Sequence, residues 1–402
     1  MLHGAVVTAG SASQDALADV LAGFARVPLS ALAATDLEAF DAVVVPRSVD
    51  AEALWTRRHQ FARFLDRGGV LVAFGELFTH WVPGARWEPE SPEDVLEAPM
   101  THEHPLIAGL EPDLLWWHRG PERWCSHGHV KAPEGAELVV TNVRGDAWLY
   151  VDRVTTRGTI VVGSNLDLDT HLFHGSALAR TLLERLVAWL EEEVKRTAAL
   201  RQRPSDRIAY YYSGVHFQHA LLESDPGRAF AVVPAAELGA LDLASYPALL
   251  VPRESDQAIL EEQRPRLDAY LRAGGTLISF EEVTRPWLPG GGWERAQLER
   301  TADGVLALAR AEHPLLRALP PLARPWHVHG LLRVPDDAER LIWDASSGRA
   351  ALALWPWGAG RVLAGTIDPD CHVGYGSELP RAFLAAAVAW ATERAPVATP
   401  AD

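Results

Sequence analysis

The stretch GGVLVAFGE at residues 68–76 decides the fold of this 402-residue chain, because it returns as GGTLISFEE at residues 274–282. Each copy places a glycine pair before a short apolar run and a carboxylate after it. A glycine pair is typical of a helix end, and a short apolar run bounded by turn residues is typical of a buried strand. The chain therefore carries the same helix, strand and turn twice.

The similarity extends outward from these stretches in both directions. Residues 36–87 match residues 242–293 without a gap, with 19 of 52 positions identical. Downstream, EHPL (103–106), WxxHG (124–128) and DxDxH (167–171) return in the same order at 312–315, 326–330 and 368–372. Such ordered matches indicate an internal duplication. We predict one domain over residues 1–195, a second over 206–395, and a charged linker at 191–206.

Each copy alternates apolar runs with stretches of helical spacing. Strands are predicted at 4–8, 42–45, 70–74, 137–141, 148–151, 159–162, 208–212, 248–251 and 276–280. Helices are predicted at 13–25, 51–67, 176–194, 257–273 and 377–393. This alternation predicts an α/β fold in which each domain has a mostly parallel sheet with helices on both faces.

The composition of the chain argues against several classes of function. The formal net charge of −16 disfavours nucleic acid and anionic membranes, which select basic patches. The two cysteines, Cys125 and Cys371, cannot build a disulfide framework, which favours a reducing cytoplasm. We find no signal peptide and no apolar run of the roughly 20 residues that span a bilayer, so a soluble cytoplasmic protein is expected.

Two repeated features resemble a known family: a strand and turn at 68–76 and 274–282, and a late strand followed by a His loop at 159–171 and 361–372. The family that they resemble is the class I glutamine amidotransferase-like superfamily, in its trehalose-utilisation (ThuA-like) branch. The resemblance implies two tandem flavodoxin-like domains. In working members the turn presents a nucleophilic Cys, which a later His activates. Here the turns read FGEL (74–77) and FEEV (280–283), without Cys or Ser. A carboxylate cannot replace a thiolate in attack on an amide, so glutaminase activity is not expected.

Three residues of the DxDxH loop could carry out chemistry. If the loop is extended, Asp167, Asp169 and His171 lie on one face, where they could bind a divalent metal or act as an acid–base set. Alternatively, the aspartates cap the following helix. Glu76, in the turn that corresponds to the family's nucleophile, is expected near a helix N-terminus and joins Asp169 and His171 as a candidate catalytic residue. No cofactor is otherwise expected.

The remaining candidates are residues suited to binding a ligand. Trp124 and His127 could form a stacking surface, or the Trp could pack its loop onto the sheet. Arg47 and Arg253 could clamp an anion, or pair with Asp50 and Asp256. The candidate ligand-binding residues are Arg47, Trp124, His127, Glu282, Trp326, His329, Asp370 and His372.

Three functions fit these observations. The leading hypothesis is a degenerate, non-catalytic protein that binds a small polar or carbohydrate-like ligand or a protein partner, with its domains packed about a pseudo-two-fold axis. The second is a hydrolase or isomerase acting on a carbohydrate-like substrate, with or without a metal. The third is an assembly protein whose loop tryptophans form contacts. Convergence of Glu76, His127 and His171 in one place would favour the enzyme.

Overall fold

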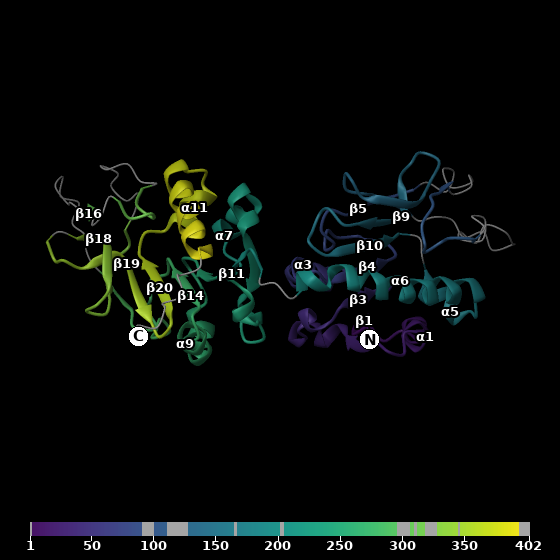
Figure 1. Ribbon diagram of the computed structural model, residues 1–402, viewed down its shortest axis with the longest axis horizontal. Coiled ribbons are helices and arrows are strands. Elements are labelled where there is room, and N and C mark those ends of the chain that lie inside the picture. Colours follow the sequence, from purple (N-terminus) through teal and green to yellow (C-terminus); the bar gives the residue numbers. More distant parts are fainter. Residues whose placement is uncertain are drawn as a thin grey trace, which may run out of the picture. The chain divides into compact units, whose positions relative to one another are not determined.

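The computed structural model describes residues 2–90, 100–110, 128–164, 167–201, 205–295, 306–308, 312–317, 328–344 and 346–393. The chain divides into two compact units, Met1–Arg203 and Pro204–Asp402. Each unit is an α/β domain built on one mixed sheet. Figure 1 labels the elements of both.

The first domain contributes ten strands to its sheet. They are β1 (Gly4–Thr8), β2 (Ala25–Pro28), β3 (Ala42–Val45), β4 (Val70–Phe74), β5 (Arg86–Pro89), β6 (Met100–Thr101), β7 (Gly128–Lys131), β8 (Glu137–Thr141), β9 (Ala147–Asp152) and β10 (Thr159–Gly163). Their order is β2-β1-β3-β4-β10-β9-β7-β5, with β8 pairing with β9 and β6 with β8.

The α/β fold is confirmed, but the expectation of a mostly parallel sheet is wrong. The first five strands in that order pair in parallel, whereas β9, β7, β5, β8 and β6 pair antiparallel. Antiparallel strands need only short connections, and β8, β9 and β10 follow one another closely along the chain. Each domain is thus half classical parallel α/β and half antiparallel extension.

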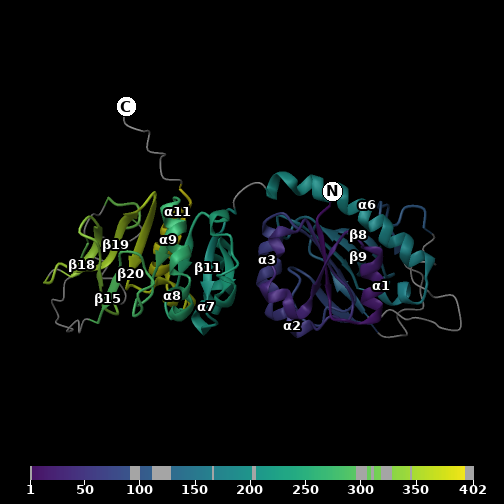
Figure 2. The same cartoon turned by 90° about the horizontal axis from the view of Figure 1, so that it is seen from below.

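Helices cover both faces of the parallel half. Those of the first domain are α1 (Ala12–Val20), α2 (Ala51–Thr56), α3 (Arg58–Asp66), α5 (Leu168–Phe173) and α6 (Ala177–Arg201), with 3₁₀ turns at Leu29–Ala34 and Leu37–Ala39. Figure 2 shows α1 and α6 on one side of the sheet and α2 and α3 on the other. Within β1, Val6 joins the core under α1 and α6, while Ala5 and Val7 join the opposite core. Period-2 alternation of apolar side chains therefore builds two cores from one strand.

The second domain repeats this plan. Its strands are β11 (Ile208–Tyr212), β12 (Phe230–Pro234), β13 (Leu249–Val251), β14 (Thr276–Ser279), β15 (Gly292–Glu294), β16 (Leu306–Leu308), β17 (Leu331–Arg333), β18 (Glu339–Asp344), β19 (Ala350–Trp357) and β20 (Gly360–Gly365). Its helices are α7 (His216–Glu223), α8 (Gln257–Glu262), α9 (Arg264–Arg272), α10 (Pro369–Gly374) and α11 (Glu378–Thr392), with 3₁₀ turns at Asp225–Ala229, Ala235–Glu237 and Leu243–Ser245. The strand order, β12-β11-β13-β14-β20-β19-β17-β15, matches the first sheet position by position.

The predicted linker differs from the structure over most of its length. Helix α6 continues to Arg201 and packs on the first domain throughout. Glu193 accepts hydrogen bonds from Arg153 and Thr159, and Arg201 donates to the Glu38 and Phe40 carbonyls. Glu193 and Arg201 were expected to belong to a solvated linker. They instead form ion pairs and hydrogen bonds within the first domain. No helix in the described ranges has the length and apolar character to cross a bilayer.

Candidate functional site

Three side chains of the first domain meet beyond the carboxyl ends of neighbouring parallel strands. Arg47 follows β3, Glu76 follows β4 and Asp167 follows β10. These strands lie side by side in the order β3-β4-β10, so the loops that leave them emerge at one sheet edge. In open α/β sheets this edge is where ligands bind.

Arg47 connects the three loops. Its guanidinium donates to both carboxylate oxygens of Glu76, with Nε–Oε2 and Nη2–Oε1 distances of 2.9 and 2.7 Å. Its third nitrogen, Nη1, donates to Asp167 Oδ2 at 2.5 Å. Burial alone would lower the pKa of Arg47, but its hydrogen bond to Glu76 and the surrounding carboxylates raise it. A guanidinium engaged on all sides in this way has little capacity left for an anionic ligand.

The expected partners of this arginine were different. Asp50 accepts hydrogen bonds from the backbone N–H groups of Glu52 and Ala53 and so caps α2, and Asp256 caps α8 in the same manner. A helix cap is the ordinary use of an Asp at that position. The expectation that Glu76 lies near a helix N-terminus is also wrong, because no helix occurs between β4 and β5.

The DxDxH loop is helical, which corrects the extended conformation assumed for it. Asp167 stands at the N-cap position of α5, and Asp169 and His171 belong to the helix. Residues two apart on a helix do not share a face, so the alternation argument for a common metal site fails. In the described ranges, no three or more His, Cys, Asp and Glu side chains are grouped to hold a metal ion.

Asp169 and His171 are both buried beside Arg47. Asp169 accepts a hydrogen bond from Ser13 at 3.3 Å, and burial raises its pKa above the ordinary value. Burial, and then the positive charges of His174 and Arg47, lower the pKa of His171 to about 4. At neutral pH His171 is therefore an uncharged imidazole beside a salt-bridged arginine.

Both domains hold the arginine loop in the same unusual backbone conformation. The residue after each arginine, Ser48 or Glu254, has a left-handed φ of 64° or 57°. A glutamine side chain on the first helix braces each loop, since Gln14 Nε2 donates to the Arg47 carbonyl at 3.1 Å and Gln218 Nε2 to the Arg253 carbonyl at 2.9 Å. Non-glycine residues in this region cost energy and concentrate at functional sites.

The second-domain cluster has the same framework but a different centre. Asp368, whose side chain is 1% exposed, accepts a hydrogen bond from Arg253 Nη1 at 3.1 Å. His329 Nε2 lies 3.1 Å from the oxygen that accepts from Arg253, Oδ2, and His372 Nε2 lies 3.4 Å from the other oxygen, Oδ1. Burial would raise the pKa of Asp368, but the His329 hydrogen bond and the nearby cationic groups lower it.

The Arg253–Glu282 pair is looser than the pair in the first domain. Arg253 Nε lies 3.7 Å from Glu282 Oε1, which is beyond hydrogen-bond distance, and the same oxygen lies 3.4 Å from His329 Nδ1. The side chains of Glu282, His329 and His372 remain 28%, 17% and 26% exposed. The second domain therefore presents several polar groups to solvent around one buried carboxylate.

Two further carboxyl groups lie beneath this cluster. Glu281 replaces Gly75 of the first domain, and its carboxylate accepts from the backbone N–H groups of Ser255 and Glu282. Burial raises the pKa of Glu281 to about 8 and that of Asp370 to about 7. Asp370 Oδ2 accepts from the Arg253 N–H at 3.0 Å, while its buried Oδ1 has no hydrogen-bond partner among the described residues. Near pH 7 the Glu281 carboxyl is therefore mostly protonated and that of Asp370 about half protonated.

The structure brings together most, but not all, of the predicted site residues. In the first domain Arg47, Glu76, Asp167, Asp169 and His171 gather at one sheet edge, and in the second Glu282, His329, Asp370 and His372 do so. Trp124, His127 and Trp326 lie outside the described residues, as does Cys125. The proposed convergence of Glu76, His127 and His171 therefore stays a prediction.

Sequence reasoning missed Glu281 and the hub role of Asp368. A signal for the first was available, because the second copy doubles the carboxylate where the first has Gly75-Glu76. A second buried acid at the end of a buried strand is unusual, since carboxylates are seldom fully buried without a partner. The role of Asp368 could not be found in this way, because its partners come from loops far apart in the chain.

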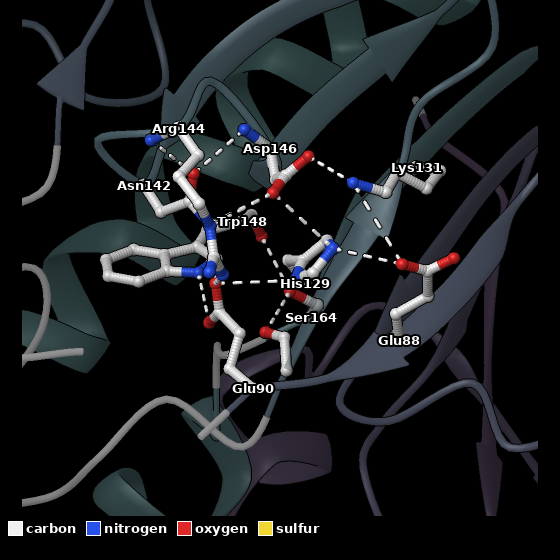
Figure 3. A network of polar contacts seen from close by, with 10 residues as sticks. Glu88, Glu90, His129, Lys131, Asn142, Arg144, Asp146, Trp148 and Ser164 are labelled. Carbon is white, nitrogen blue, oxygen red and sulfur yellow. Dashed lines mark hydrogen bonds and ion pairs between the residues drawn. The ribbon is translucent and has the colours of Figure 1, made fainter. Parts of the chain in front are cut away.

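A separate polar network occupies the antiparallel half of the first domain, as Figure 3 shows. At its centre is Glu90, whose side chain is 1% exposed. Its carboxylate accepts from Asn142 Nδ2 at 2.5 Å, Trp148 Nε1 at 3.0 Å and Arg144 Nη2 at 3.2 Å. Three donors, one of them a guanidinium, therefore satisfy this buried carboxylate.

His129 stands inside the same network between three carboxylates. Its ring nitrogens lie 3.3 Å from Glu90, 3.5 Å from Glu88 and 3.6 Å from Asp146, and Lys131 Nζ lies 2.5 Å from Asp146 (Figure 3). The second domain has no histidine at the corresponding place, because Leu331 pairs with Glu294 as His129 pairs with Glu88, and Ala351 takes the place of Trp148. We interpret the network as a polar core of the first domain.

Comparison with known proteins assigns no family. No protein-family model and no curated protein matches the chain. Among solved structures, the cytoplasmic proteins STM3548 of Salmonella typhimurium and STM1381 of Salmonella typhimurium LT2 are each 12% identical and cover 47% and 48% of this chain, and 98% and 99% of their own, with TM-scores of 0.35 and 0.34. The β-galactosidase of Bacillus circulans sp. alkalophilus is 11% identical over 92% of this chain and 53% of its own, with a TM-score of 0.32. At these scores the neighbours assign no activity.

Proposed function

We propose that the chain is a tandem, degenerate amidotransferase-like protein whose second domain binds a small, neutral, hydroxyl-rich ligand of the carbohydrate-like kind. Two features support the fold relationship. The parallel strands run in the order 2-1-3-4-5 typical of flavodoxin-like sheets, and the resemblance assigns the family's nucleophile to the turn after the fourth of them. Neither turn carries the Cys that glutaminase chemistry requires.

The observation that carries the proposal is the placement of His329 and His372 on the two oxygens of the buried Asp368. The hydrogen bond between His329 and this carboxylate fixes the orientation of the His329 ring, and the His372 ring lies 3.4 Å from the other oxygen as an ion-pair neighbour. Both rings remain partly exposed, as does Glu282 beside them. Oriented donors and acceptors at the carboxyl ends of parallel strands are suited to the hydroxyl groups of a small ligand.

The charge around the cluster favours a neutral ligand over an anion. Arg253 is the guanidinium of the cluster, and it already donates to Asp368 and faces Glu282. A phosphate or carboxylate ligand would meet these carboxylates before it met an available cation. Because like charges repel at such short distances, an anionic ligand would lose its hydration without gaining an ion pair in return. Hydroxyl groups can instead both donate to the carboxylates and accept from the imidazoles.

The first domain is less suited to this role. Arg47 holds Glu76 and Asp167 through hydrogen bonds of 2.5–2.9 Å, and these two carboxylate side chains are only 10% and 11% exposed. A ligand would have to break charged hydrogen bonds to reach them, each worth roughly 1.5–3 kcal/mol. We therefore assign binding to the second domain and a structural role to the first cluster.

One observation favours an enzymatic alternative, a hydrolase or isomerase that acts on the same class of molecule. A partly exposed imidazole hydrogen-bonded to a buried carboxylate, as His329 is to Asp368, is the arrangement of a general base. A bound ligand that is converted during prolonged incubation, followed by NMR, would establish this alternative. Recovery of unchanged ligand would leave the protein as a binder.

Isothermal titration calorimetry of the full chain tests the proposal. The ligands are neutral hexosides and polyols, with inorganic phosphate as the anionic comparison. We expect neutral members to bind, and His372→Ala to weaken their binding at least about tenfold, which corresponds to about 1.4 kcal/mol. The matched control is His219→Ala, an exposed histidine on α7 that pairs with Glu223 outside the cluster. Preferential binding of phosphate, or equal losses in both variants, would refute the proposal.

A further inference from the structure

We propose that Tyr375 determines ligand specificity at the second-domain site by stacking its exposed ring against the apolar face of a cyclic, hydroxylated ligand. This inference rests on the proposed function and narrows it to a pyranose-like ring. Tyr375 directly follows α10, the helix that carries Asp370 and His372. It is 64% exposed, in contrast to the tyrosines buried in the core of the same domain.

The tyrosine ring is exposed and yet held in place. Its hydroxyl lies 3.1 Å from His216 Nε2 on α7, and it also shares a hydrogen bond with the Cys371 thiol. The ring centroids of His216 and Tyr375 lie 6.4 Å apart. Two polar tethers on the hydroxyl fix the orientation of the ring while leaving its faces available. A fixed ring loses little conformational entropy when a ligand stacks on it.

The helix beneath the ring is also fixed. A Cβ at Gly374 would lie 2.9 Å from the Phe217 carbonyl oxygen, which shows that α10 approaches the α7 backbone closely. Asp370, Cys371 and Val373 of α10 are buried as well. The position of Tyr375 relative to α7 is therefore set by close backbone packing and not by a free loop.

The ring borders the polar cluster. Tyr375 follows His372 by three residues at the end of α10, a spacing that places two side chains on the same helix face, and its hydroxyl shares a hydrogen bond with the thiol of Cys371, the chain neighbour of Asp370 and His372. An aromatic face beside oriented polar groups is the combination that a sugar-like ring requires, since such a ring has an apolar C–H face and a polar edge. An aromatic side chain of this kind offers a large contact area together with a polar tip.

This reasoning separates cyclic from open-chain ligands. A pyranoside presents a preformed flat face, whereas an alditol with the same hydroxyl groups must first give up its conformational freedom. Both can use the imidazoles and Glu282, but only the cyclic ligand gains fully from the tyrosine ring. Tyr375 should therefore discriminate by shape, while His329 and His372 should recognise hydroxyl groups in either class.

The first domain offers a matched control. Its corresponding helix, α5, ends with Phe173, which is 55% exposed, and with His174, whose ring lies edge-on to it at 5.3 Å. The position of His216 is taken by Ala12, so the polar tether to a neighbouring helix is absent from that position. Phe173→Ala thus removes an exposed aromatic ring of similar size without touching the second-domain cluster.

The test compares three methyl hexopyranosides (gluco, galacto and manno) with sorbitol, galactitol and mannitol, by calorimetry on the full chain. We expect Tyr375→Ala to lower pyranoside affinity about tenfold or more and to change alditol affinity less than about twofold. Tyr375→Phe should keep pyranoside affinity within about threefold of wild type, because the ring remains. Phe173→Ala should change neither class. Thermal unfolding of each variant checks that the fold is retained.

Each outcome has a separate meaning. Equal loss of pyranosides and alditols in Tyr375→Ala, or no loss of either, overturns the stacking role while the binding function stands. Pyranosides that bind wild type no better than alditols overturn the preference for a ring. Absence of binding by every neutral probe to wild type instead defeats the proposed function, and the role of Tyr375 falls with it.

Discussion

Arg47 holds Glu76 through two parallel hydrogen bonds, whereas its second-domain counterpart Arg253 lies 3.7 Å from Glu282 and makes neither. The two domains share a strand order, a strained residue after the arginine and a bracing glutamine. They differ in how tightly the arginine is paired. The duplication has thus produced one closed cluster and one that keeps polar groups exposed.

This difference predicts unequal responses to a conservative substitution. Arg47→Lys replaces a planar fork with a single ammonium group, which cannot donate in parallel to both oxygens of Glu76. We expect it to destabilise the first domain by about 2 kcal/mol, the value of a charged hydrogen bond. Arg253→Lys, the matched variant, should cost less than about 1 kcal/mol, because one charged contact with Asp368 can be retained. Urea denaturation of the full chain measures both; equal losses would contradict the difference in pairing.

The turn after β4 predicts a second effect. Gly75 has a φ of +84°, and a Cβ placed there would lie 2.5 Å from Arg47 Cγ and 3.1 Å from Arg47 Cα. Gly75→Ala combines backbone strain with a clash, so we expect a loss of about 2–4 kcal/mol. Gly10→Ala is the control, since Gly10 has a similar φ of +87° with nothing within 4 Å. Gly10→Ala should lower the free energy of unfolding through backbone strain alone, by about 1–2 kcal/mol. Thermal or urea unfolding that ranks the two equally would rule out the clash.

His171 predicts a loss of first-domain stability in acid. Burial, His174 and Arg47 lower its pKa to about 4 in the folded state, below the 6.5 of a free imidazole. Between these values the unfolded chain binds the proton more readily, so stability is lost as the pH falls from about 6.5 to about 4. The loss due to this group is about 2–3 kcal/mol at its largest. His171→Gln should flatten this part of the curve of unfolding free energy against pH, and parallel curves would exclude the effect.

Glu281 predicts the opposite dependence in the second domain. Burial raises its pKa to about 8 from the ordinary 4.5, so the folded state holds the proton more strongly than the unfolded chain. Stability is therefore fully present below about pH 4.5 and declines as the pH rises towards 8, by at most about 1.4 kcal/mol per pH unit for this group. Glu281→Gln should become more stable relative to wild type over that range. Asp370 titrates nearby and remains in the variant, so the slope should diminish without vanishing. An unchanged slope in urea denaturation would show that Glu281 does not titrate there.

The local residue pattern was sufficient to predict the elements in the parallel half of each domain. The strands expected at 4–8, 42–45 and 70–74 coincide with β1, β3 and β4, because a short apolar run between turn residues is a property of the segment itself. The helix expected over 51–67 is divided at Arg57 into α2 and α3, and its counterpart is divided at Gln263. The duplication was visible for the same reason, since repeated residues need no structure to be compared.

Strands that depend on distant partners were harder to find. Strands β5 and β7 carry polar residues such as Glu88, His129 and Lys131. These residues belong to a sheet because of their network with Asp146, and not because apolar and polar residues alternate along the strands. Strand β2 was not predicted: the helix expected over 13–25 ends at Val20, and β2 begins at Ala25 and pairs with β1 residue by residue. The energy gained by pairing with β1 outweighed the weak local conformational preference of the β2 residues.

The sequence by itself determined the duplication, the α/β class and the set of polar residues that leave the buried strands. The tertiary structure alone decided which of these residues pair. Asp50 lies three positions from Arg47, but the left-handed backbone at Ser48 intervenes and Asp50 caps α2. The arginine instead meets Glu76 and Asp167, 29 and 120 residues away. Such contacts depend on strand order, because a parallel sheet brings the ends of its strands to one edge whatever their separation along the chain.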